Sequence, residues 1–172
     1  MADNINTYYF DASGGGPTDP GGVWADDANA VDGSILTNAI SSTPGSASSN
    51  YLLIEGTNAP TSGSGISQVR ARLYGSGDSF VGDTTVSGPI YTNEKAELLG
   101  TPSAEYDLDD DGWSEYVTLS APSGGWTWAK TQALEVYVFA TAADLFDGSV
   151  YRVEVEVTSG TSSGPLPMFF RP

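Results

Sequence analysis

The clearest pattern in the chain is a strict alternation of apolar and polar residues toward its C-terminal end. In residues 151–158 (YRVEVEVT) apolar side chains stand at every second position, with charged residues between them. Residues 134–140 (LEVYVFA) carry a matching apolar set, and the segment between the two contains an Asp-Gly pair. A period of two is typical of a strand with one buried face, and Asp-Gly favours a tight turn. The two segments therefore predict a pair of strands at the centre of the fold.

Further strands are predicted earlier in the chain. Residues 66–74 (ISQVRARLY) alternate in the same way, and residues 51–55 (YLLIE) form an apolar run that suits a buried strand. Residues 89–92 and 94–99 are shorter candidates, and stretches rich in Gly, Ser and Asp separate all of these segments. We predict an all-β fold, an antiparallel β-sandwich of jelly-roll type with about eight strands.

The alternation is confined to residues 23–158, which we interpret as a β-sandwich domain between two terminal segments. Residues 1–22 form an N-terminal arm in this interpretation, because a short apolar group precedes GGGPTDPGG, which continues neither a helix nor a strand. An ordinary first strand followed by a loop is the alternative. Residues 159–172 form a C-terminal tail with an apolar tip. We predict that both ends bind a partner through these interface residues: Tyr8, Tyr9, Phe10, Leu166, Met168, Phe169 and Phe170.

The amino-acid composition excludes several kinds of catalytic and metal site. The 172 residues include no cysteine and no histidine, which removes disulfides, thiolate metal sites and every nucleophile that depends on a histidine base. Nothing singles out a catalytic pair of carboxylates, so we predict that the protein is not an enzyme. The net charge of −16 repels nucleic acid, and no apolar stretch approaches the ~20 residues that span a bilayer. We expect neither nucleic acid nor a membrane among its partners.

An acidic segment, residues 107–115 (DLDDDGWSE), has the D-x-D-x-D-G spacing of a calcium loop. Oxygen ligands at alternate positions curl around one cation, and the glycine permits the sharp turn. The predicted ligands are Asp107, Asp109, Asp111 and Glu115, although Thr118 stands where an EF-hand has its bidentate glutamate. A solvated acidic hairpin loop is the alternative interpretation.

Residues 29–37 (NAVDGSILT) provide a second candidate for structural calcium. This stretch resembles the N-A-x-D-G-x-x-x-T segment of galactose-binding-like jelly rolls, the discoidin and family 32 carbohydrate-binding domains. The resemblance implies a Ca²⁺ ion held by Asp32, Thr37 and either Glu154 or Glu156 on the last strand. A plain Asp-Gly turn is the alternative.

The four tryptophans, Trp24, Trp113, Trp126 and Trp128, are candidates for stacking on a sugar ring. Trp126 and Trp128 stand two residues apart, so in a strand both side chains would point to the same side. They would then present a platform to one face of a saccharide. Core packing or an interface anchor is the alternative for such residues.

The order of segments from Trp24 to Thr158 resembles small β-sandwich proteins encoded among the virion genes of tailed phages. The resemblance is carried by the W…A.DGS..T.A opening and by YLLIE, ISQVRARLYG, GGWTWAKTQALEV and RVEVEV. It implies a non-enzymatic structural protein of a virus particle, a capsid decoration or head-fibre protein anchored by its terminal segments. The expected partners are the major capsid protein or other virion subunits, and further copies of the chain in a homo-oligomer.

Two alternatives to the virion role stay open at this point. One is a calcium-dependent carbohydrate-binding module for host-surface glycans, and the other is a subunit of an extracellular filament. The first residues lack a basic region followed by an apolar run, which favours synthesis in the host cytoplasm and a final location in the virion.

Overall fold

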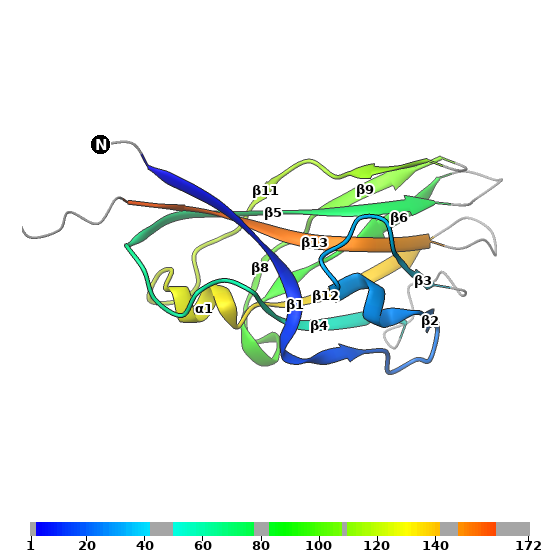
Figure 1. The fold of residues 1–172 in the computed structure, drawn as a ribbon, viewed down its shortest axis with the longest axis horizontal. Helices are drawn as coiled ribbons and strands as arrows, with labels where there is room; N and C mark the ends of the chain where they lie inside the picture. Colours follow the sequence, from blue (N-terminus) through cyan, green and yellow to red (C-terminus); the bar gives the residue numbers. More distant parts are fainter. Residues whose placement is uncertain (1–2, 42–49, 78–82, 108–109, 142–147, 161–172) are drawn as a thin grey trace, which may run out of the picture.

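Antiparallel strands make up almost all of the regular structure in the computed structural model, which describes residues 3–41, 50–77, 83–107, 110–141 and 148–160 (Figure 1). Its helical segments are α1 (Trp128–Gln132) and the 3-10 turns η1 (Asp27–Val31) and η2 (Asn93–Lys95). Within those residues no helix is long and apolar enough to cross a membrane. The strands are β1 (Asn4–Thr18), β2 (Trp24–Ala25), β3 (Ala39–Ser41), β4 (Leu52–Thr57), β5 (Ile66–Gly77), β6 (Thr84–Ser87), β7 (Ile90–Tyr91), β8 (Leu98–Gly100), β9 (Ser103–Tyr106), β10 (Asp111–Trp113), β11 (Val117–Thr118), β12 (Glu135–Thr141) and β13 (Gly148–Ser159).

One layer of the sandwich is built on β5 and β13, the two strands with the strictest alternation. They pair along their whole length, from Gly148 opposite Gly77 to Ser159 opposite Ile66. Strands β10 and β11 extend the layer beyond β5, and β3 and the first half of β1 pair with β13. The alternation predicted for residues 66–74 and 151–158 is therefore confirmed.

The second layer is built on β4 and β12, which pair antiparallel with Val136 opposite Ile54. Strand β12 also pairs with β7 and, at its far end, with β6, which pairs with β9. The side chains between the two layers form one core of fully buried residues from β4, β5, β12 and β13, listed here in chain order: Leu52, Ile54, Val69, Ala71, Leu73, Val136, Val138, Val153, Val155 and Val157. The fold is the predicted all-β jelly-roll sandwich.

Strand β1 joins the two layers, and this corrects the prediction of an N-terminal arm. Residues 4–9 pair with β13, whereas Phe10 and the residues after it pair with β4, with Ala12 in the left-handed region (φ 58°) near the change. The glycine run lets the chain lie against Glu55, because a Cβ atom on Gly14 would stand 3.2 Å from the backbone carbonyl group of Glu55. Residues 4–18 therefore form a strand of the sandwich, which was the alternative interpretation.

One shorter prediction was also wrong. Residues 93–95 form η2 instead of a strand, with Glu94 and Lys95 both in the left-handed region (φ 59° and 55°). In the part of the chain that the structure describes, thirteen strands are present where about eight were expected, because short pairs such as β7 and β8 form between the long ones. The end of the predicted tail, with Leu166, Met168, Phe169 and Phe170, lies outside the described residues.

Candidate functional site

An open cleft of about 300 Å³ lies between helix α1 and the loop that leads into β5. The loop contributes one wall through residues 61–66, and the segment 126–129 contributes the other. Both predicted sugar-stacking residues, Trp126 and Trp128, line this cleft. The sequence prediction placed them on a strand, and this was wrong, because they stand at the start of a helix.

Helix α1 begins where the sequence offers a cap. Thr127 accepts a hydrogen bond through its side-chain oxygen from the Lys130 backbone N–H at 3.2 Å, which satisfies one of the free donors of the first turn. Gly124 and Gly125 precede it, both with φ of 77°. Such backbone favours glycine and interrupts a strand, so the chain changes direction just before Trp126.

The two tryptophans have different roles in the cleft. Trp128 is only 8% exposed and forms its floor: its indole N–H donates to the Ser64 carbonyl at 2.7 Å, and the Tyr8 ring packs edge-on against it. A Cβ atom on Gly63 would lie 2.5 Å from the Trp128 indole nitrogen, so a glycine is needed there. Trp126 is half-buried and packs on the edge of the core, which leaves part of its ring facing the cleft.

Lys130 fixes the loop that carries Trp126. Its ammonium group donates to the Ser123 carbonyl at 2.6 Å and to the Gly125 carbonyl at 2.9 Å, and the Gly125 N–H donates to the Pro122 carbonyl at 2.7 Å. These bonds close the turn 122–125 and set the direction in which Trp126 leaves it.

The lining of the cleft carries no charged side chain. Its ten lining residues are Thr61, Ser62, Gly63, Ser64, Gly65, Ile66, Trp126, Thr127, Trp128 and Ala129, and none of them carries a charge. The side chains offer hydroxyl groups and aromatic surface in a protein with 22 acidic residues. Such a surface suits a ligand that is itself neutral and rich in hydroxyl groups.

The N-terminal residues predicted to bind a partner are used within the chain itself. Phe10 is fully buried in the core. Tyr8 packs against Trp128, and burial raises the pKa of its hydroxyl group. Tyr9 is half-buried, with the Arg152 guanidinium 4.9 Å from its ring centre. This apolar group was predicted to be available for an interface because the pairing of β1 was not recognised.

The acidic loop stays a prediction for calcium, because Asp109 lies outside the described residues. A side-chain hydrogen bond between the protonated Asp107 carboxyl group and Asp83, together with the like charge of Asp83, raises the pKa of the Asp107 carboxyl group. Asp111 accepts a hydrogen bond from the Tyr74 hydroxyl at 3.0 Å, and Glu115 is exposed. Among residues that the structure describes, no three acidic side chains gather closely enough to hold a metal ion.

The second candidate, the Asp-Gly turn after η1, is tied to the last strand by an arginine. The Thr37 hydroxyl donates to the Asp32 carboxylate, which also accepts from the Ser34 N–H. Arg152 donates to the Gly33 carbonyl at 3.0 Å and pairs with Glu154 at 3.2 Å. A positive side chain therefore already joins the turn to β13.

The two glutamates that the resemblance offers as ligands are committed to other groups. Glu154 is 3% exposed and also accepts from Arg72 and from the Tyr116 hydroxyl. Glu156 pairs with Arg70 at 2.6 Å. A calcium ion between Asp32 and β13 stays a prediction, and the plain Asp-Gly turn stays its alternative.

No protein-family model and no curated protein matches the sequence. Solved structures that share its β-sandwich include the CBM22-1 and GH10 modules of endo-1,4-beta-D-xylanase 10B from Clostridium thermocellum, complexed with xylohexaose (10% identity, TM-score 0.46, 84% of this chain and 25% of that one). The C-terminal CBM6 of LamC from Zobellia galactanivorans (11%, 0.46, 87% and 98%) and the xylan-binding module CBM15 (10%, 0.46, 93% and 99%) are also similar. The chain thus spans a quarter of the first of these proteins and nearly all of the other two.

Sequence reasoning missed most of the cleft. The loop residues 61–65 were read only as a connection, and Thr127 and Lys130 were not noticed. One signal was present: a threonine directly before the helix-forming run WAKTQA is a typical N-cap. The contact between Gly63 and Trp128 joins residues 65 positions apart, and no local pattern reports it.

Proposed function

We propose that this protein is a non-catalytic module that binds a neutral carbohydrate in the cleft of Trp126 and Trp128. The observation that carries the proposal is the uncharged lining of this cleft, in which an aromatic ring stands beside hydroxyl groups. A pyranose ring has an apolar face that stacks on an indole and an edge of hydroxyl groups that donate to and accept from serine and threonine.

The similar solved structures do not add to this argument, because their TM-scores are below 0.5 and their identities are at most 11%. The cleft lining offers no carboxylate, so calcium is not part of the proposed binding step. The proposal keeps the carbohydrate-binding interpretation and leaves out its calcium dependence.

The virion assembly role has less support. It rested on two apolar ends that bind a partner, and one of them, around Phe10, is buried in the chain's own core. The other end, residues 166–170, lies outside the described residues. Assembly through the C-terminal tail, the homo-oligomer and the virion location stay predictions.

The test is calorimetric titration of the full chain with neutral oligosaccharides built of glucose or of xylose. We expect saturable binding to at least one series, and a loss of tenfold or more in affinity for Trp126→Ala, because stacking on an aromatic ring contributes on the order of 1–3 kcal/mol. Trp113→Ala is the matched control, since Trp113 is half-buried on β10, away from the cleft lining. Equal binding by the two variants, or no binding to either series, would count against the proposal.

A further inference from the structure

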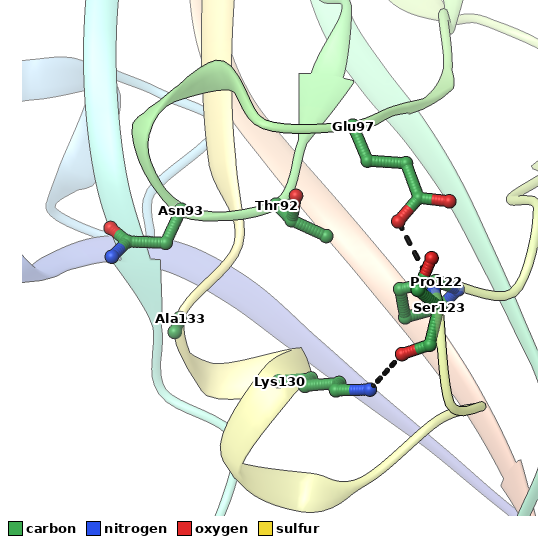
Figure 2. Close-up of a pocket in the computed structure, with 7 residues that line it drawn as sticks. All are labelled: Thr92, Asn93, Glu97, Pro122, Ser123, Lys130 and Ala133. Atoms are coloured by element: carbon green, nitrogen blue, oxygen red, sulfur yellow. Dashed lines mark hydrogen bonds between the residues drawn. The ribbon is translucent and has the colours of Figure 1, made fainter.

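A second pocket, of about 250 Å³ and with a different lining from the tryptophan cleft, lies beside helix α1 (Figure 2). Its lining comes from two places in the chain: the turn that contains η2 contributes Thr92, Asn93 and Glu97, and the segment around α1 contributes Pro122, Ser123, Lys130 and Ala133. This volume is below the roughly 300–1,000 Å³ of sites for drug-sized ligands, so the pocket suits one small molecule.

The pocket holds one positive and one negative group, and both retain bonding capacity. Lys130 uses two of its three N–H donors on the Ser123 and Gly125 carbonyls. Glu97 accepts from the Ser123 backbone N–H through one oxygen at 3.1 Å. Figure 2 shows the two side chains reaching Ser123 from opposite sides. Within the described residues neither forms an ion pair, so the third ammonium proton and the second carboxylate oxygen remain for a ligand.

The turn that carries Thr92, Asn93 and Glu97 contains two residues, between Asn93 and Glu97, in an unfavourable backbone conformation. Glu94 and Lys95 are consecutive residues in the left-handed region, and neither is a glycine. Their backbone N–H groups converge on the buried Glu135 carboxylate, at 2.6 and 3.3 Å. The Lys95 ammonium group lies 3.8 Å from the centre of the Tyr137 ring. Strain of this kind is concentrated at binding sites, where surrounding contacts maintain it.

We propose that this pocket binds a single neutral pyranose ring, at a site separate from the tryptophan cleft. One negative group, Glu97, and one positive group, Lys130, together favour a ligand without net charge over an acidic or basic one. Adjacent hydroxyl groups of the ring donate to Glu97 and accept from Lys130, and its apolar face lies on Pro122 and Ala133. The hydrogen bonds of both side chains to the Ser123 backbone hold them in place before the ligand arrives, which reduces the entropy lost on binding.

The site is tested by titrating the ¹⁵N-labelled full chain with neutral methyl pyranosides of glucose, galactose, mannose and xylose. We expect saturable, millimolar shifts of the Asn93 and Glu97 amide signals with at least one of them. Glu97→Gln keeps an acceptor for Ser123 but removes the charge, and it should weaken this binding about tenfold. Glu105→Gln, an exposed glutamate on β9, is the control and should leave the shifts unchanged.

Thr92→Val is a second variant that removes a lining hydroxyl group without changing side-chain size. Its melting temperature and that of Glu97→Gln show whether the fold is kept. The proposal is overturned if no pyranoside shifts Asn93 or Glu97, if Glu97→Gln binds as the parent chain does, or if glycine shifts these signals and the sugars do not. The Trp126→Ala variant should retain the shifts of Asn93 and Glu97. The proposal of sugar binding in this pocket and the proposal of sugar binding in the tryptophan cleft can therefore fail independently of each other.

Discussion

The β5–β13 pair and the cleft around α1 differ in how their residues are held. In the strand pair, each inward side chain meets apolar neighbours, and both arginines of β5 meet a glutamate directly across the pair, as with Arg72 and Glu154. In the cleft, individual hydrogen bonds, such as the one from Trp128 to Ser64, hold together segments that are distant in the sequence. The comparison shows that the strand pair is stabilised by repetition, whereas the cleft depends on a few individual contacts.

The largest expected effect is on the sandwich itself. Phe10→Ala removes a fully buried ring and should lower the free energy of unfolding by about 3–5 kcal/mol, measured by chemical denaturation. Ile5→Ala, on the same strand but 61% exposed, is the control and should change it little. A small loss at Phe10 would contradict the assignment of β1 to the chain's own core.

The next effect concerns the outward face of the strand pair. Glu154→Gln removes a charge that serves Arg72, Arg152 and Tyr116, and hydrogen bonds to charged groups contribute roughly 1.5–3 kcal/mol. We expect a loss of that order in denaturation, with binding at the cleft unchanged. If Glu154→Gln were as stable as the parent chain, these ion pairs would be no more than surface contacts.

A smaller effect on stability but a larger one on binding is expected in the cleft. Gly63→Ala places a methyl group against the Trp128 indole, and such overpacking costs about 1–3 kcal/mol. The affinity for oligosaccharides should also fall, because the loop 61–66 must move away from Trp128 to make room for the methyl group. Gly16→Ala, on β1 and outside the cleft lining, meets open space and is the control, so equal binding by the two variants would show that this wall does not shape the site.

The smallest effect is a dependence of stability on alkaline pH. Burial raises the pKa of Tyr106 from 10 to about 12, so the folded chain holds this proton more tightly than the unfolded chain. The resulting stabilisation is complete below pH 10 and is lost as the pH rises toward 12. The melting temperature of Tyr106→Phe should therefore fall less over this range than that of the parent chain, and parallel curves would contradict this.

The difference between the two regions also explains what could be predicted from the sequence. A repeated pattern identifies β5 and β13, since one misplaced residue would turn every side chain to the wrong face. The glycines of β1 interrupt such a pattern, and its pairing with two different strands is decided by tertiary contacts. Trp126 and Trp128 were correctly brought together at one candidate site, but their spacing alone could not show that Thr127 starts a helix between them.

The central claim, that the tryptophan cleft binds a neutral sugar, is tested most directly by the four indole N–H signals of the chain. Neutral glucose or xylose oligosaccharides are added to the ¹⁵N-labelled protein, and all four signals are followed. The account predicts that the Trp126 and Trp128 signals shift in a saturable way while those of Trp24 and Trp113 stay in place. A shift of Trp113 without Trp126, or no shift of any indole signal with either series, would contradict it.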